Sequence, residues 1–258
     1  MEHLCDLLFE VSNEDRLRML RRLEEGAMNV TGLSRGLGLT TQEVSRHISR
    51  LGETGLVKKA TDGQYSLTSL GRLTLRQIEG LEFTSRHNKY FINHTVEDLL
   101  ASFVYRIGEL EGSSRVDDVM VVFNNVERMI REAEEYVWRL TDRYLMMALP
   151  ELEAATDRGV EFRLMKSKGF EFPPDWPGPG KILAKARADG VFKLRESDAA
   201  RVFIAMSEKE VAALAFPTTE GRFDYFGFTS KDEGTHGWCS DVFQYYWDRA
   251  QIPDFMRE

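Results

Sequence analysis

The segment from Thr40 to Leu51 limits the possible folds of this chain more than any other. Thr40 and Glu43 are three residues apart, which is the spacing of a capping box, so we expect a helix to begin there. Val44, Ile48 and Leu51 follow at positions i, i+4 and i+7, which places them on one face of that helix. The sequence therefore predicts an amphipathic helix with one buried stripe.

The opposite face of this helix is polar and basic. Gln42, Arg46 and Ser49 point away from the apolar stripe, and Ser45 and Arg50 flank them. Most charged helix faces are only solvated surface. The meaning of this face therefore depends on the elements around it.

The neighbouring elements complete a known pattern. A helix is predicted over residues 12–25, with Ser12 as its N-cap, and a short helix follows over residues 30–37. After the amphipathic helix, strands at residues 56–59 and 65–67 form a hairpin around a turn that contains Gly63, and Thr68 caps a further helix. This order of helices and β-ribbon predicts an α+β winged helix-turn-helix domain.

Three short motifs in this region resemble the ArsR- and MarR-like winged-helix regulators. They are Val44-Ser45-Arg46-His47-Ile48, Gly55-Leu56-Val57 and Tyr65-Ser66-Leu67-Thr68-Ser69-Leu70-Gly71. The likeness covers roughly residues 10–80. The wing is shorter than in those families and has Asp62 where Arg is frequent, so we do not expect its tip to contact the minor groove.

The resemblance implies that this domain binds double-stranded DNA, with the amphipathic helix in the major groove. The N-terminus of the helix would hold phosphate, its polar face would meet base edges and phosphates, and the base of the wing would meet phosphate only. His47, beside the apolar Ile48, is expected to pack at the helix edge or to contact phosphate. The predicted contact residues are Thr40, Thr41, Gln42, Ser45, Arg46, His47, Arg50, Lys58 and Lys59.

A length of 258 residues indicates two domains, because roughly 100 to 200 residues form one. We place the DNA-binding domain at residues 1–80, a helical connector at 81–115 and a second domain at 116–258. Apolar residues recur every three or four positions in the connector, at Leu99, Phe103, Ile107 and Leu110. This stripe favours the seam of a homodimer that reads a palindromic operator with half-sites about 34 Å apart, but it can equally pack against the second domain.

Strands and helices alternate in the second domain. After a short apolar run at 120–123, helices are predicted around residues 126–133, 150–158, 181–188 and 242–250. Strands are predicted at 137–140, 160–164, 191–194, 202–206, 211–216 and 223–228, and the proline-rich residues 169–180 are predicted to form a loop. This order predicts an α/β domain whose mixed sheet is covered by helices.

Two segments of this domain resemble the effector domains of archaeal winged-helix regulators, namely the TrmB group and the methanogenesis and filamentation regulators. The segments are Asp157–Arg163 and Trp238–Trp247. Such domains look like phospholipase-D folds without the catalytic residues. The likeness to effector domains implies a domain that senses a small molecule. Arg139, Arg163 and Trp238 are the predicted effector contacts, and a protein-interaction module without a ligand is the alternative.

The sequence contains no complete catalytic or metal-binding motif. A phospholipase-D enzyme uses H-x-K-x4-D, but after His87-Asn88-Lys89 the position of the aspartate is occupied by His94. We therefore predict that the protein is not an enzyme, and a phosphodiesterase is the enzymatic alternative. His236 and Cys239 have the spacing of a metal pair, but a zinc site needs about four ligands, so no metal or other cofactor is predicted.

A net charge of -8 opposes DNA binding for the chain as a whole, because a protein must neutralise phosphates to hold a duplex. Residues 1–80, however, hold 11 basic and 11 acidic residues, so the whole acidic excess lies in residues 81–258. The N-terminal domain can therefore present a basic face. Two distant cysteines and the lack of an apolar run of about 18 residues predict a cytoplasmic protein that does not enter membranes.

Overall fold

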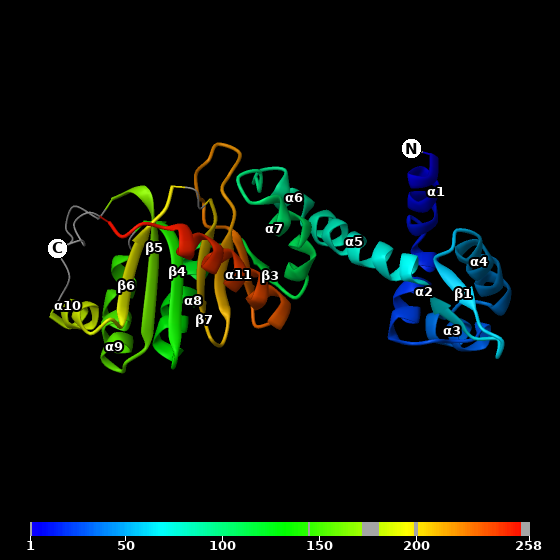
Figure 1. Cartoon of the computed structure of the whole chain (residues 1–258), viewed down its shortest axis with the longest axis horizontal. Coiled ribbons are helices and arrows are strands. Elements are labelled where there is room, and N and C mark those ends of the chain that lie inside the picture. The colour runs from blue at the N-terminus through cyan, green and yellow to red at the C-terminus, as the bar shows by residue number, and fades with distance from the viewer. Residues whose placement is uncertain (1, 144, 172–180, 199–200, 254–258) are drawn as a thin grey trace. The chain divides into compact units, whose positions relative to one another are not determined.

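The computed structural model describes residues 2–143, 145–171, 181–198 and 201–253. It contains two compact units, Met1–Leu81 and Glu82–Glu258, which we call the first and second units (Figure 1). The boundary falls within α5 (Ser69–Arg86). Within the described ranges, every helix is too short or too polar to cross a membrane.

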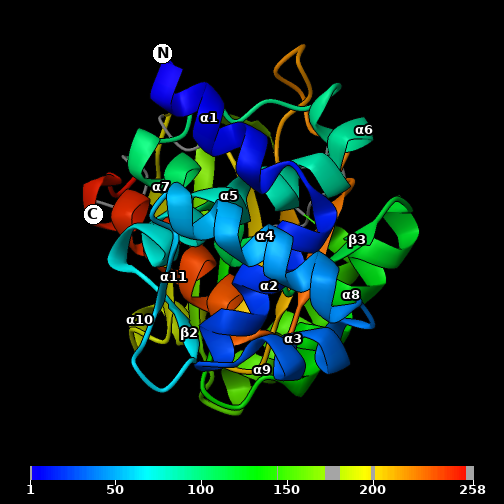
Figure 2. The same ribbon diagram turned by 90° about the vertical axis from the view of Figure 1, so that its right-hand side faces the viewer.

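The first unit consists of helices around one hydrophobic core, with a β-hairpin at its side. Side chains from α2, α3, α4 and the hairpin meet in this core, where Leu20, Leu33, Ile48 and Leu67 are at most 1% exposed. In Figure 2, α4 runs across the near side of the unit. The elements before α5 are α1 (Glu2–Val11), α2 (Glu14–Glu25), α3 (Val30–Leu37), α4 (Thr41–Glu53), β1 (Val57–Lys59) and β2 (Tyr65–Leu67).

The capping box predicted at the start of α4 is confirmed. The backbone N–H of Glu43 donates to Thr40 Oγ1 (3.2 Å), and the Glu43 carboxylate accepts from the backbone N–H of Thr40 (2.9 Å). The Thr40 hydroxyl also donates to this carboxylate, and these hydrogen bonds lower the pKa of Glu43. The predicted stripe of Val44, Ile48 and Leu51 is buried.

The start of α2 differs by one residue from the prediction. Asn13, not Ser12, is the N-cap, and its side chain accepts a hydrogen bond from the backbone N–H of Arg16 (3.1 Å). Ser12 instead follows α1, a helix that we did not predict, and its hydroxyl donates to the carbonyl oxygen of Phe9 (2.9 Å). The Ser12 hydroxyl therefore provides a hydrogen bond to a carbonyl oxygen at the C-terminal end of α1, and Asn13 caps α2.

The turn from the hairpin into α5 explains the last motif residue, Gly71. A Cβ at Gly71 would lie 2.2 Å from the carbonyl oxygen of Leu56, so only glycine allows this close approach. Thr68 caps α5 as predicted, because its hydroxyl accepts from the backbone N–H of Gly71 (3.0 Å) and donates to the carbonyl oxygen of Gly55 (2.6 Å).

The second unit is built on a seven-stranded mixed sheet with the strand order β3-β9-β8-β7-β4-β5-β6. The neighbours β4, β5 and β6 are parallel, and the other pairs are antiparallel. The bounds of the strands are β3 (Ser114–Val116), β4 (Tyr136–Arg143), β5 (Glu161–Glu171), β6 (Phe192–Glu196), β7 (Phe203–Ser207), β8 (Val211–Ala215) and β9 (Gly227–Ser230).

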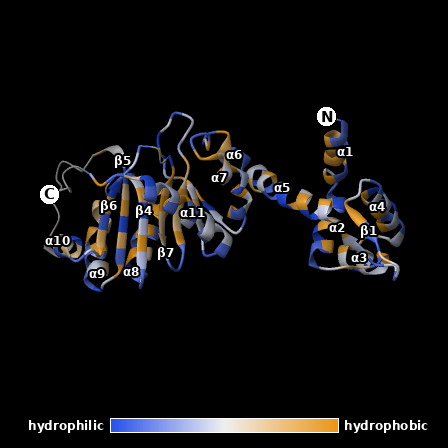
Figure 3. Cartoon of the chain, in the orientation of Figure 1, coloured by the Kyte–Doolittle hydropathy of each residue, from blue (hydrophilic) through white to orange (hydrophobic). Residues whose placement is uncertain are grey.

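Helices cover both faces of this sheet. α11 (Glu233–Arg249) packs on one face, and α8 (Val119–Glu132) and α9 (Leu149–Asp157) pack on the other. β7 divides its side chains accordingly, since Ile204 and Met206 join the α11 core and Phe203 and Ala205 join the α8 core. Figure 3 shows hydrophilic and hydrophobic residues interspersed along β4, β5 and β6. The predicted mixed sheet covered by helices is confirmed.

The expected connector packs into the second unit. It contains α6 (Asn88–Phe91), α7 (Ala101–Tyr105) and the 3-10 helix η1 (Ile107–Leu110), not one long helix. Its apolar stripe, Leu99, Phe103, Ile107 and Leu110, is buried in the same core as Trp238. The stripe therefore packs against the chain's own sheet and helix, and it does not form the dimer seam that we favoured. Residues 114–116, at the expected border between the connector and the second domain, form the edge strand β3.

Three other predictions need correction. Residues 120–123 are the first turn of α8 and not a separate run, because Asp118 caps that helix by accepting from the backbone N–H of Met120 (2.8 Å). The strand expected at 223–228 begins only at Gly227, since Tyr225 has a left-handed φ of 64° that interrupts an extended chain. The loop expected at 169–180 is wrong at its start, where β5 continues to Glu171, and residues 172–180 lie outside the described residues.

Candidate nucleic-acid interface and candidate ligand groove

The exposed face of α4 carries most of the predicted contact residues. Two turns of this helix present Gln42, Ser45, Arg46 and Ser49 to solvent, opposite the buried stripe. The side chain of Arg46 has no ion-pair partner among the described residues. The predicted phosphate contacts Thr40 and Thr41 are also exposed, at the N-terminus of α4, where backbone N–H groups attract anions.

Arg50 is exposed as well, but its guanidinium is already engaged. Its Nη2 lies 2.7 Å from Glu10 Oε1 and its Nε lies 3.3 Å from Glu10 Oε2, and the guanidinium lies 5.3 Å from the centre of the Phe9 ring. The hydrogen bond to Glu10 raises the pKa of Arg50. Arg50 must therefore leave Glu10, or share it, before it can contact another anion.

Glu10, which contacts the candidate face through Arg50, was not predicted from the sequence. Its side chain is 6% exposed and lies between Arg50 and the buried Arg16, whose Nε is 3.0 Å from Glu10 Oε2. Arg16 also donates to the backbone carbonyl oxygens of Glu10 (2.7 Å) and Phe9 (2.8 Å). The apolar spacing of Leu4, Leu7, Leu8 and Val11 was the signal that could have revealed α1 and, with it, this carboxylate.

The structure places His47 on the inner side of α4, which removes it from the candidate contacts. His47 is 7% exposed, and its Nδ1 has no hydrogen-bond partner among the described residues. Burial lowers the pKa of His47, and the positive charge of Arg46 and Arg16 lowers it further. A neutral, buried imidazole is a packing residue, which was the alternative expectation.

Lys58 and Lys59 are exposed on β1, as expected for phosphate contacts. Successive side chains of a strand point to opposite faces, so the two lysines lie on different sides of the hairpin. Lys59 shares its side with Tyr65, whose ring centre is 5.5 Å from the Lys59 ammonium. One duplex therefore cannot meet both ammonium groups through the same face of the hairpin.

The three predicted effector contacts do not form one site. Arg139 lies between Trp138 and Leu140 on β4 and points to the opposite face, towards the core under α8. Arg163 is on the α11 face, with its guanidinium 4.9 Å from the Trp138 ring. Trp238 is fully buried, and its Nε1–H donates to the carbonyl oxygen of Phe103 (3.1 Å). Of the three, Arg163 alone lines a described pocket.

That pocket is an open groove of about 640 Å³ beside the edge strand β6. We call it the basic groove. β5, α10 (Lys181–Ala188), β6 and α11 contribute its polar lining, together with the indole of Trp247. The residues that define it are Arg163, Arg187, Lys193, Arg195, Gln244 and Trp247.

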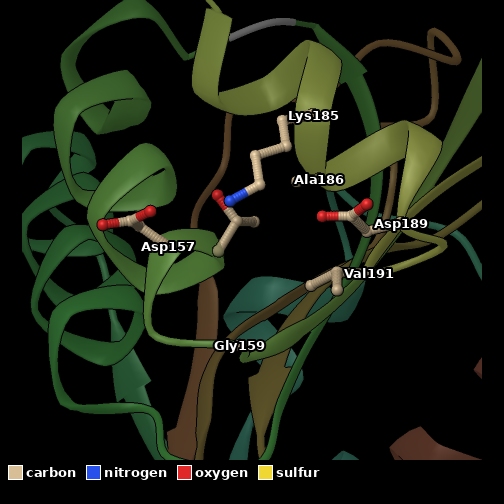
Figure 4. A pocket seen from close by; sticks show the side chains of 7 residues that line it. Asp157, Gly159, Lys185, Ala186, Asp189 and Val191 are labelled. Atoms are coloured by element: carbon tan, nitrogen blue, oxygen red, sulfur yellow. The ribbon is translucent and has the colours of Figure 1, made fainter.

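A smaller cleft of about 330 Å³ lies between α9 and α10. Figure 4 shows Lys185 projecting into it, with Asp157 on one side and Asp189 on the other. Since a single cation faces two carboxylates, this cleft has no excess of positive charge for an anion. The basic groove is therefore the better candidate for a ligand of the second unit.

His94, His236 and Cys239 are each engaged in packing or hydrogen bonds within the second unit. His94 is 6% exposed, stacks on Tyr90 and places Nε2 3.1 Å from the Asp224 carboxylate. His236 Nε2 lies 2.8 Å from the carbonyl oxygen of Ser207, and Cys239 is fully buried, which raises the pKa of its thiol. In the part of the chain that the structure describes, no three His, Cys, Asp or Glu side chains are grouped to hold a metal ion.

Residues 5–88 match the family described as the HVO_A0261 N-terminal domain. No curated protein matches the chain. Among solved structures, the chain is similar to TrmBL2, described as an archaeal chromatin protein with a novel mode of DNA binding, at 15% identity over 93% of this chain and 94% of that chain (TM-score 0.41). It is also similar to NucT from Helicobacter pylori, at 12% identity over 55% of this chain and 98% of that chain (TM-score 0.38). The phospholipase D family member Nuc from Salmonella typhimurium is 11% identical over 55% of this chain and 97% of that chain (TM-score 0.35).

Proposed function

We propose that this protein is a sequence-specific transcription regulator that binds double-stranded DNA through a winged helix-turn-helix in its first unit. The observation that carries the proposal is the exposed face of α4, where Gln42, Ser45 and Arg46 are free of the core, on a helix that also contacts β1 of the hairpin. A helix of this kind fits the major groove, where Gln and Arg side chains distinguish adenine and guanine edges. The capped N-terminus of α4 and one of the two lysines of β1 would hold phosphates.

The test is fluorescence anisotropy with duplexes obtained by selection from random sequences, in competition with unselected DNA and over a range of salt concentrations. We expect the wild-type protein to prefer the selected duplex, with an affinity that falls linearly in log salt. Arg46→Gln should weaken binding roughly 10- to 100-fold and relax the preference at one base pair. Arg222→Gln, which removes the same charge from an exposed ion pair in the second unit, is the matched control. If Arg46→Gln binds like the control, the assignment of α4 is wrong.

The proposal includes a homodimer that reads a palindromic operator. In the described part of the first unit, six large apolar side chains are exposed, namely Leu4, Leu8, Phe9, Leu70, Leu73 and Leu81. Exposed apolar residues on neighbouring turns of a helix are typical of an association surface. Leu73→Lys should convert a dimer into a monomer in size-exclusion chromatography with light scattering, whereas Met147→Lys in the second unit, with similar exposure at 58%, should not. A wild-type monomer would contradict this part of the proposal.

We also propose that the second unit binds a small effector and has no catalytic role. Two observations support this part of the proposal. The His94 side chain is hydrogen-bonded to the Asp224 carboxylate, and the basic groove is open. An effector changes DNA binding only if its affinity differs between the two states of the protein. A second unit that only mediates protein contacts is the competing function, and it predicts that no metabolite raises the melting temperature.

A further inference from the structure

The basic groove has an excess of positive charge in a part of the chain that is otherwise acidic. Residues 81–258 hold 23 basic and 31 acidic residues. The groove nevertheless gathers Arg163, Arg187, Lys193 and Arg195, against Asp248 as the one carboxylate among its lining residues. This local excess of positive charge creates a positive potential in the groove, which attracts anions.

Two of these cations are placed directly opposite each other. Arg163 on β5 and Lys193 on β6 are register partners, an arrangement that is unfavourable for like charges. Glu161 compensates both, with its carboxylate oxygens 2.7 Å from Arg163 Nε and 2.6 Å from Lys193 Nζ. Arg187 and Arg195 have no such carboxylate partner among the described residues. In the part of the chain that the structure describes, two guanidinium groups of the groove are therefore not ion-paired.

Aromatic rings hold the guanidinium groups in place. Arg195 lies 4.8 Å and Arg163 lies 5.7 Å from the ring centre of Trp247, which is only 5% exposed and stacks on Phe243. Arg195 Nη1 also donates to the backbone carbonyl oxygen of Trp247, and Arg163 Nη1 donates to Gln244 Oε1 (3.2 Å). Because Arg195 is already ordered, a ligand that pairs with it loses less conformational entropy on binding.

We propose that the basic groove binds a small molecule that carries an oxyanion, a phosphate or a carboxylate, through Arg187 and Arg195. A guanidinium presents two parallel N–H donors that match the oxygens of either group. The volume of about 640 Å³ is in the range of small-molecule sites. This inference deepens the proposed function, because it rests on the second unit being the effector-binding part. Charges on an edge strand also prevent pairing with other strands, and that role alone requires no anion.

The test is isothermal titration of the full-length protein with pyrophosphate and, in a separate arm, with malonate, at constant ionic strength set by sodium chloride. Saturable binding of either probe supports the groove, and the preferred probe identifies the source of the oxyanion. Arg187→Gln should weaken that binding about tenfold or more, since it removes a charge-assisted hydrogen bond. Arg222→Gln, with the same loss of charge on an exposed side chain, should bind like the wild type. The melting temperature of Arg187→Gln should be unchanged, because the side chain is exposed and has no ion-pair partner in the described residues.

Three results would overturn the proposal: no saturable binding of either probe, wild-type affinity in Arg187→Gln, or equal losses in Arg187→Gln and Arg222→Gln. Loss of DNA affinity in Arg187→Gln without any anion would also overturn it, because the groove would then contact DNA. Measuring DNA affinity with and without the bound probe separates this site from the proposed regulator. If the anion binds but DNA affinity stays the same, the groove is confirmed and its role as the effector site is wrong.

Discussion

The two units carry their candidate sites in different ways. In the first unit, Gln42, Ser45 and Arg46 come from two turns of a single helix. In the second unit, the basic groove takes residues from two strands and two helices, and Arg163 and Gln244, which share a hydrogen bond, are 81 residues apart. A site on one helix follows from the helical period, whereas a site across parallel strands exists only once the register is set.

The largest expected effects concern the separate cores of the two units. Trp238→Ala empties a fully buried position in the second unit and should lower its free energy of unfolding by about 3 to 5 kcal/mol. Leu20→Ala should lower that of the first unit by about 2 to 5 kcal/mol. Hydrogen exchange of the full chain measures both units at once. Each variant should accelerate exchange in its own unit, and an equal effect of Trp238→Ala on both units would contradict the division at residue 81.

The next effect tests the contact between α1 and α4. Glu10→Gln removes the carboxylate that compensates the buried Arg16, and breaking a buried ion pair costs about 3 kcal/mol or more. It also releases Arg50, so the slope of log affinity for DNA against log salt should become steeper by about one. Urea unfolding and salt-dependent anisotropy measure the two effects. Glu24→Gln, which affects an exposed ion pair with Arg21, is the control, and a loss of stability without a change in slope would mean that Arg50 does not reach DNA.

A smaller effect is expected from the hairpin. If its lysine contacts phosphate, Lys58→Gln or Lys59→Gln should weaken binding to all DNA sequences alike. It should also reduce the slope of log affinity against log salt by about one. Because the two lysines lie on opposite sides of the hairpin, we expect only one of the variants to show this change. Anisotropy at several salt concentrations identifies it. A change in base preference in either variant would show that the hairpin reads sequence and not only phosphate.

The smallest effect is a pH dependence of the first unit. Burial lowers the pKa of His47 in the folded chain, with Arg46 and Arg16 adding to the shift and Asp15 and Glu43 opposing it. Between the folded and unfolded pKa values the unfolded chain binds more protons, so stability rises with pH. The first unit should therefore be less stable at pH 5 than at pH 7.5. His47→Gln should flatten this slope, and His3→Gln, at an exposed position, should leave it unchanged. Equal slopes in all three proteins would exclude His47 as the cause.

Much of the first unit was predictable because its signals are local. The capping box of Thr40 and Glu43, the buried stripe of α4 and the hairpin from Val57 to Leu67 all agree with short-range rules. The error at Ser12 was also local, because α1 was not predicted and Ser12, which follows its last residue, was taken as the cap of the next helix. The role of Glu10 was not predictable, because it depends on Arg50, which is 40 residues away.

Prediction was less complete in the second unit. The apolar spacing of Leu99, Phe103, Ile107 and Leu110 is the same whether these residues meet another copy or their own core, so the period could not decide between the two. Arg139, Arg163 and Trp238 are of residue types that often contact ligands, but residue type alone does not show whether a side chain lines a groove or packs in the core. Arg139 and Arg163 are on parallel neighbouring strands, and only their register assigns them to opposite faces of the sheet.

The sequence by itself determined the order of most helices and strands, the buried and exposed faces of α4 and the mixed character of the sheet, because hydrophobic period and capping act over a few residues. The tertiary structure alone decided which side chains become neighbours. Glu10 joined Arg16 and Arg50, the connector stripe joined Trp238, and Arg163 joined Arg195 and Trp247. Such contacts depend on strand register and helix packing, and these arise from burial of apolar surface over the whole unit, not from any one segment.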